Sequence, residues 1–280
     1  MSALIETVQS ELLTAIDNDE LILPTLPEVA LQVREAAEDP DVGLNELSKV
    51  ISNDAALTAR IIKVVNSPLL RSSSEISDLN MAVNRLGMSY TANLAMGLAM
   101  EQMFQATSDV IDRRLRDVWA TSTEVAGISH VLCRHFTRLK PDQAALAGLV
   151  HQIGILPILS YAEEHGQLLS DSFTLEQVIE RLHPVLGQRI LQAWDFPPGL
   201  INVPMEYLDF ERHTDTVDYV DIVQVALLQL YAGNEHPLGQ IDWTRVDAFR
   251  KLGLEVSEQS LEADEDLTAS MEAATKMLQA

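Results

Sequence analysis

The chain has 280 residues, of which 47% are hydrophobic and 5% are aromatic, and its formal net charge is −23. This composition excludes a disordered chain, and its wealth of aliphatic residues favours helices packed on helices. The negative charge argues against nucleic acid and anionic membranes as partners, because both are bound through positive surfaces.

Caps and stops place the helices in the first part of the chain. Asp54 and Asp78 offer side-chain oxygens to the free amides of a first helical turn. Asn66-Ser67-Pro68 is a helix stop, and Gly87 is a suitable C-cap. We predict helices over residues 1–22, 44–51, 55–65, 79–86 and 94–104.

The second part opens after polar residues 105–109 with a long predicted helix over about residues 110–138. Lys140-Pro141-Asp142 ends it, and Pro157 is expected to kink or end the helix that follows. The acid-rich residues 255–266 fit either a solvated helix or a tail. Further segments are expected to begin at Thr174, His183 and Pro197, with a buried helix over 219–231. No segment alternates as a strand does, so the predicted fold class is all-α.

Two features bear on compartment and redox chemistry. The amino terminus lacks a basic segment followed by an apolar core, and no uninterrupted apolar run approaches the roughly 20 residues that span a bilayer. We therefore expect a cytoplasmic protein. The single cysteine, Cys133, cannot form a disulfide within the chain, and its apolar neighbours predict a buried side chain.

One polar pair, His151-Gln152, interrupts the apolar residues 146–159 and is followed by Ile153-Gly154. In order and spacing, this pair and other short motifs resemble the HDOD family, the HD-related output domains, a non-catalytic branch of the HD-domain metal-dependent phosphohydrolases. The resemblance runs from Leu23 to Ala232. Its motifs are Leu23-Pro24-Thr25-Leu26-Pro27, residues 51–68, Met81-Ala82-Val83-Asn84-Arg85-Leu86-Gly87, residues 149–154, His183-Pro184-Val185-Leu186-Gly187 and Trp194-Asp195-Phe196-Pro197.

This resemblance implies a two-lobed helical fold of the HD-domain, phosphodiesterase-like type. The implied HDOD domain covers residues 23–232, with an N-terminal lobe over 23–106 and a degenerate HD-like lobe over 107–232. The remaining residues, 233–280, are expected to form an acidic helical extension.

The resemblance also indicates which metal ligands are missing. HD hydrolases use a first His, the His-Asp pair and a final Asp, and a second His pair near Glu206-Tyr207 in two-metal relatives. The corresponding positions here are Thr121, His151, Gln152 and Leu227, with Asp218 and Asp221 near the last. Only His151 is retained, and one imidazole cannot hold a hydrolytic ion. The resemblance therefore implies no catalytic residue, no metal ligand and no cofactor.

Other roles remain open for several residues. His151, Gln152, His183 and Tyr207 are candidates to line the former metal site, where they either bind a small molecule or fill the space with hydrogen bonds. His183 also precedes a proline at a predicted helix start, which favours a structural role. Asn66 and Ser67 form either a partner surface or only a helix stop.

The predicted function is a non-catalytic bacterial signal-transduction module that acts by protein–protein interaction. Its expected partners are signalling proteins, and self-association is an open alternative. Two rival functions are a metal-dependent phosphohydrolase with an atypical site, built from His151, His183 and Asp218 or Asp221, and a small-ligand sensor without turnover.

Overall fold

The structure is a computed structural model that describes residues 7, 8, 10, 11, 14, 23–70, 75–254 and 265–278. Throughout these residues the regular elements are helices, which confirms the all-α prediction. The predicted helix over residues 1–22 and the acid-rich residues 255–266 lie mostly outside the described ranges.

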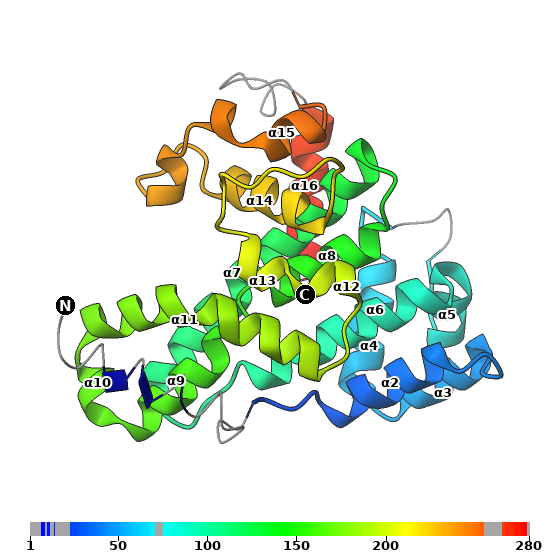
Figure 1. The fold of residues 1–280 in the computed structure, drawn as a ribbon. Coiled ribbons are helices and arrows are strands. Elements are labelled where there is room, and N and C mark those ends of the chain that lie inside the picture. Colours follow the sequence, from blue (N-terminus) through cyan, green and yellow to red (C-terminus); the bar gives the residue numbers. More distant parts are fainter. Residues whose placement is uncertain are drawn as a thin grey trace.

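The N-terminal lobe is a group of short helices, blue to cyan in Figure 1. Asp54 and Asp78 cap two of them as predicted, each carboxylate accepting a backbone N–H from the first turn. Gly87 ends one helix at φ +80° and starts the next at once, so the helix expected from residue 94 begins at Met88. The helices are α2 (Glu28–Glu38), α3 (Leu44–Ser52), α4 (Ala55–Val65), α5 (Leu79–Leu86), α6 (Met88–Ala99) and the 3-10 turn η1 (Met100–Met103).

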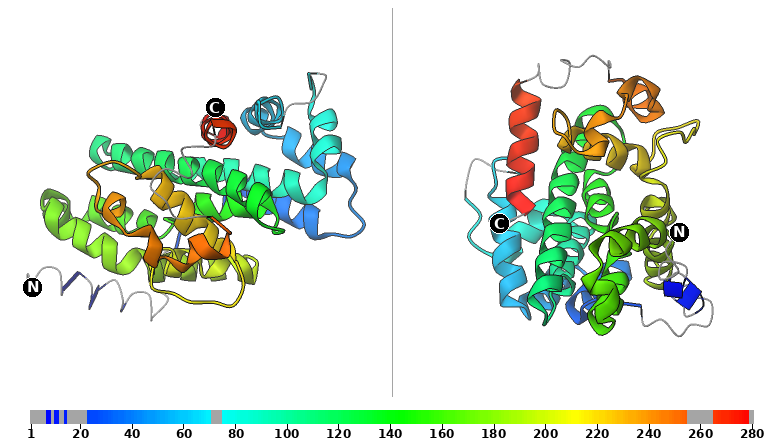
Figure 2. Two further views of the ribbon diagram at one scale, coloured as in Figure 1. Left: turned by 90° about the horizontal axis from the view of Figure 1, so that it is seen from above. Right: turned by 90° about the vertical axis from the view of Figure 1, so that its left-hand side faces the viewer.

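The second lobe is built on α7 (Asp109–Phe136), the long predicted helix. Packed against α7 are α8 (Pro141–Val150), α14 (Tyr219–Leu230) and α16 (Glu265–Leu278) (Figure 2). Gly148 of α8 lies so close to α7 that a Cβ there would sit 2.4 Å from the Ala126 Cα. Gly127 likewise faces the backbone of α16. These glycines allow the helices to pack backbone to backbone around a common core.

Of the remaining helices, α11 packs against α9 and α13, and α15 packs against α14. Two predictions about prolines were wrong here. The chain breaks at residues 151–154, ahead of Pro157, which lies in the first turn of α9. No helix begins at His183, because α11 runs straight through Pro184. These elements are α9 (Ile155–Glu164), α10 (Gly166–Ser170), α11 (Ser172–Ala193), α12 (Pro198–Ile201), α13 (Val203–Glu206), η2 (Pro237–Gln240), η3 (Trp243–Arg245) and α15 (Asp247–Lys251).

One stretch, Pro141–Glu164, is long and apolar enough to cross a membrane by length and composition, although polar residues such as His151 and Gln152 interrupt its apolar run. The turn at residues 151–154 divides this stretch into α8 and α9. Of its most apolar window, 78% is buried inside the fold, as in a core helix. Cys133 is also buried, as predicted.

Candidate functional site

The predicted site residues meet where the turn after α8 presses against α11. His151 and Gln152 lie in this turn, His183 is in α11, and Tyr207 follows α13. A Cβ on Gly154 would lie 2.0 Å from the His183 carbonyl oxygen and 2.5 Å from the Gly187 nitrogen. Only glycine at position 154 therefore permits this approach. We call His151, Gln152, His183 and Tyr207 the histidine–tyrosine cluster.

Tyr207 is the centre of this cluster. His183 Nδ1 lies 2.7 Å from the Ile179 carbonyl oxygen, which can only accept, so Nδ1 carries the proton. His183 Nε2 is then an acceptor, and the Tyr207 hydroxyl donates to it at 2.7 Å. The Gln152 side chain also hydrogen-bonds this hydroxyl. Burial raises the pKa of Tyr207, so the hydroxyl stays protonated and able to donate.

His151 is completely buried beside Tyr207. Its Nδ1 lies 2.6 Å from the Gly148 carbonyl oxygen and donates to it, while Nε2 has no hydrogen-bond partner among the described residues. The Tyr207 ring stands edge-on to the imidazole, with centroids 4.9 Å apart. Burial lowers the pKa of His151 to about 4, so the ring is neutral at pH 7.

The other two predicted HD-site positions, Thr121 and Leu227, have different surroundings. Thr121, on α7, hydrogen-bonds the hydroxyl of Tyr231. Leu227 is buried in the apolar core of α14. Across the residues that the structure describes, no group of three or more His, Cys, Asp or Glu side chains is placed to hold a metal ion.

The carboxylates required by the atypical hydrolase are already paired with cations. Arg212 contacts Asp218 and Asp221, each at 2.8 Å, and Lys251 contacts Asp221 at 2.9 Å. Although burial opposes ionisation of Asp218, the hydrogen bond from Arg212 keeps the pKa of this carboxyl below its ordinary value. Asp218 and Asp221 also form the capping box of α14. This charge cluster was not predicted from the sequence, although the Asp-x-x-Asp spacing of Asp218 and Asp221 indicates the cap.

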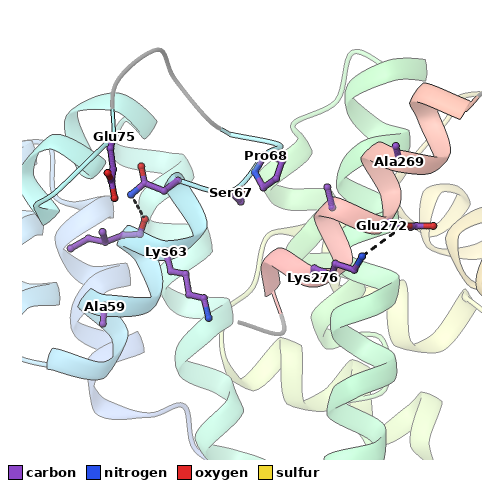
Figure 3. A pocket seen from close by; sticks show the side chains of 11 residues that line it. Ala59, Lys63, Ser67, Pro68, Glu75, Ala269, Glu272 and Lys276 are labelled. Carbon is purple, nitrogen blue, oxygen red and sulfur yellow. Dashed lines mark hydrogen bonds and ion pairs between the residues drawn. The ribbon is translucent and has the colours of Figure 1, made fainter.

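Asn66 and Ser67 lie apart from the cluster, at the end of α4. Asn66 has a structural role, because its amide donates to the Ile62 and Ile76 carbonyls and accepts the Ile76 N–H. Both residues border a groove of about 700 Å³ between α4 and α16 (Figure 3). Their assignment to a partner surface stays a prediction.

The cluster makes a first prediction, for Tyr207→Phe. The variant leaves buried His183 Nε2 without a donor and the Gln152 amide without this partner, so the free energy of unfolding should fall by about 1–3 kcal/mol. Urea denaturation measures this change. Tyr161→Phe is the control, since its hydroxyl bonds Glu11 at an exposed site and should cost less than about 0.5 kcal/mol. Equal losses in the two variants would contradict a specific role for Tyr207.

A second prediction concerns pH. Burial lowers the pKa of His151 from its ordinary value of 6.5 to about 4. Between pH 6.5 and about pH 4, the unfolded chain therefore binds a proton at His151 that the folded chain does not. Stability from this group is complete above about pH 6.5 and is lost as the pH falls towards 4. Between pH 7 and pH 5, the free energy of unfolding, measured by urea denaturation, should fall by about 2 kcal/mol less in His151→Leu than in the wild type. Identical losses would mean that His151 takes up its proton as readily in the folded protein as in the unfolded chain, and so is charged at pH 5 in both.

Comparisons with known proteins identify the family and the fold. A family model for the HDOD domain matches residues 23–207. A crystal structure from Shewanella amazonensis SB2B, provisionally named a metal-dependent phosphohydrolase, is 34% identical, with a TM-score of 0.87 over 98% of this chain and 99% of that one. An HDOD domain protein of unknown function from Geobacter sulfurreducens is 21% identical, with a TM-score of 0.65 over 97% of both chains, and shows the shared fold.

A longer relative comes from Treponema pallidum (strain Nichols) and is named an uncharacterized protein. It is 26% identical over 212 residues, which are 71% of this chain but 40% of that protein. This chain therefore matches less than half the length of that relative.

Proposed function

The chain belongs to the HDOD family, and on that premise we propose that it is a non-catalytic signalling module that acts through contacts with other proteins. Its partners in this proposal are signalling proteins of the cytoplasm, and neither nucleic acid nor a membrane is among them. The net charge of −23 supports the exclusion of both.

The observation that carries this proposal is the histidine–tyrosine cluster itself. Tyr207 is 2% exposed and its hydroxyl bonds His183 and Gln152, while its ring packs on His151. The Tyr207 hydroxyl and both ring nitrogens of His183 are thus occupied, and His151 Nε2 is the one ring nitrogen of the cluster without a hydrogen-bond partner among the described residues. A hydrolytic metal needs several ligands and an open position for water, and one neutral imidazole supplies neither.

The charge cluster on α14 supports the same conclusion. Asp218 and Asp221 lie near the position of the family's final ligand in the sequence, and each pairs with Arg212 at 2.8 Å. Recruiting either one to a metal would break its contact with Arg212, whose side chain is only 8% exposed and which would keep the other aspartate and Glu206 as partners. A metal ion would therefore have to compete with a cation that is already in place.

The rival function is metal-dependent hydrolysis, favoured by the name of the Shewanella relative. The test is hydrolysis of 4-nitrophenyl phosphate, bis(4-nitrophenyl) phosphate and nucleoside triphosphates with magnesium, manganese, iron or zinc added. We expect no turnover above that of a sample treated with chelator. Metal-dependent turnover that disappears in His151→Leu would overturn the proposal.

A further inference from the structure

A cavity of about 270 Å³ lies where the N-terminal lobe, the second lobe and the last helix meet. One wall is formed by η1 and the residues that follow it, Phe104 and Gln105, and the other by the face of α7 that carries Arg116 and Trp119. Leu278, at the end of α16, borders both walls. No residue of the histidine–tyrosine cluster lines this cavity, so it is a separate feature of the fold.

The walls of the cavity are fixed by contacts within the chain. Arg60 of α4 forms an ion pair with Glu101 on η1, and its guanidinium donates to the Leu278 carbonyl at 3.4 Å. The rings of Phe104 and Trp119 pack against each other across the two lobes, with centroids 5.0 Å apart. The cavity therefore has the preformed character of a small-molecule site.

The indole N–H of Trp119 is a hydrogen-bond donor at this cavity. Trp119 and Trp194 are both more than nine-tenths buried. The Trp194 N–H donates to the Pro24 carbonyl at 2.9 Å, as the indole of a buried tryptophan usually does. The Trp119 N–H has no acceptor among the residues that the structure describes, and its nitrogen is not one of the atoms sealed from solvent. Because Trp119 lines the cavity, this N–H can donate to a molecule bound there.

The charged groups around the cavity leave no net charge for a ligand to match. Arg116 pairs with Asp112 at 2.7 Å, and Glu101 pairs with Arg60. The apolar part of the lining comes from Phe104, Ala120 and Leu278. A ligand that matches this surface is small and uncharged, with an apolar body and a hydrogen-bond acceptor.

We propose that the cavity binds such a molecule, with its carbonyl oxygen or ring nitrogen accepting the Trp119 N–H and its apolar part against Phe104 and Leu278. Since η1 belongs to one lobe and α7 to the other, this ligand contacts both lobes and the end of α16. Binding would stabilise their packing and give the module an input. That regulatory role rests on the proposed function, whereas the binding itself does not.

The test uses benzamide, benzoate and toluene as probes of the isotope-labelled full chain. The chain has three tryptophans, so a proton–nitrogen NMR spectrum shows three indole signals, and Trp119→Phe identifies one of them by its loss. Benzamide should shift the Trp119 signal with a Kd of about 1 mM and leave those of Trp194 and Trp243 in place. Benzoate, which is charged, and toluene, which has no acceptor, should bind about 10-fold more weakly or worse.

Ala120→Leu fills the cavity from an exposed position on α7, so it should weaken benzamide binding about 10-fold or more while all three indole signals remain. Ala56→Leu is the matched control, an exposed alanine of α4 outside the cavity, and should leave binding unchanged. A Trp119 signal that stays in place up to about 20 mM benzamide, equal shifts of all three signals, or full binding in Ala120→Leu would overturn the inference. None of these results bears on catalysis, because His151 lies outside the cavity.

Discussion

Gly154→Ala is expected to lower the free energy of unfolding by about 3–5 kcal/mol. The added methyl group would stand 2.0 Å from the His183 carbonyl oxygen and 2.5 Å from the Gly187 nitrogen, both of them backbone atoms of α11. No side-chain rotation can relieve this overlap. The turn that carries His151 and Gln152 must move away from α11, which also pulls Gln152 from Tyr207.

Gly166→Ala is the matched control for this variant. A Cβ on Gly166 meets nothing within 4 Å, so the change should be neutral or slightly stabilising, through a lower entropy of the unfolded chain. Urea denaturation of both variants measures the difference. If Gly154→Ala loses less than about 1 kcal/mol, the turn is not packed against α11 as described.

Lys251→Met is expected to cost about 2–4 kcal/mol. Lys251 Nζ lies 2.9 Å from Asp221 Oδ1 and 2.6 Å from Thr214 Oγ1, and its side chain is 4% exposed. Methionine has a similar length but no charge, and of the two cations that contact fully buried Asp221 it leaves only Arg212. The loss should fall short of the full cost of a broken buried pair, because the contact with Arg212 remains.

The neighbouring residue provides the control. Arg250 pairs with Asp247 at 2.6 Å, but its side chain is 75% exposed, so Arg250→Met should cost less than about 1 kcal/mol. Thermal or urea denaturation compares the two variants directly. Similar losses would contradict the view that α15 is fixed to α14 by a buried ion pair.

The parts of the fold that follow from local rules were predictable from the sequence. Asp54, Asp78 and Gly87 act within four residues of themselves, so their neighbours alone reveal the caps. Pro184 shows the limit of such rules. A proline commonly marks a first turn, but here α11 continues through it, held between the turn at Gly154 and Pro204 of α13.

The candidate site was predictable in its members but not in its bonding. The family motifs indicated His151, Gln152, His183 and Tyr207, and the structure brings all four together. That Tyr207 donates to His183 depends on the packing of α11 and α13, which no local pattern encodes. The pairing of Asp221 with Lys251 spans 30 residues and depends on the docking of α15 in the same way.

Metal content tests the central claim, that the degenerate site has lost its metal, most directly. The purified protein is dialysed against a mixture of manganese, iron, magnesium and zinc, freed of unbound ions and subjected to elemental analysis, beside His151→Leu. The filled cluster predicts less than about a tenth of an equivalent of any ion in both proteins. One equivalent in the wild type that is lost in His151→Leu would contradict it, since His151 would then be a ligand and the site open.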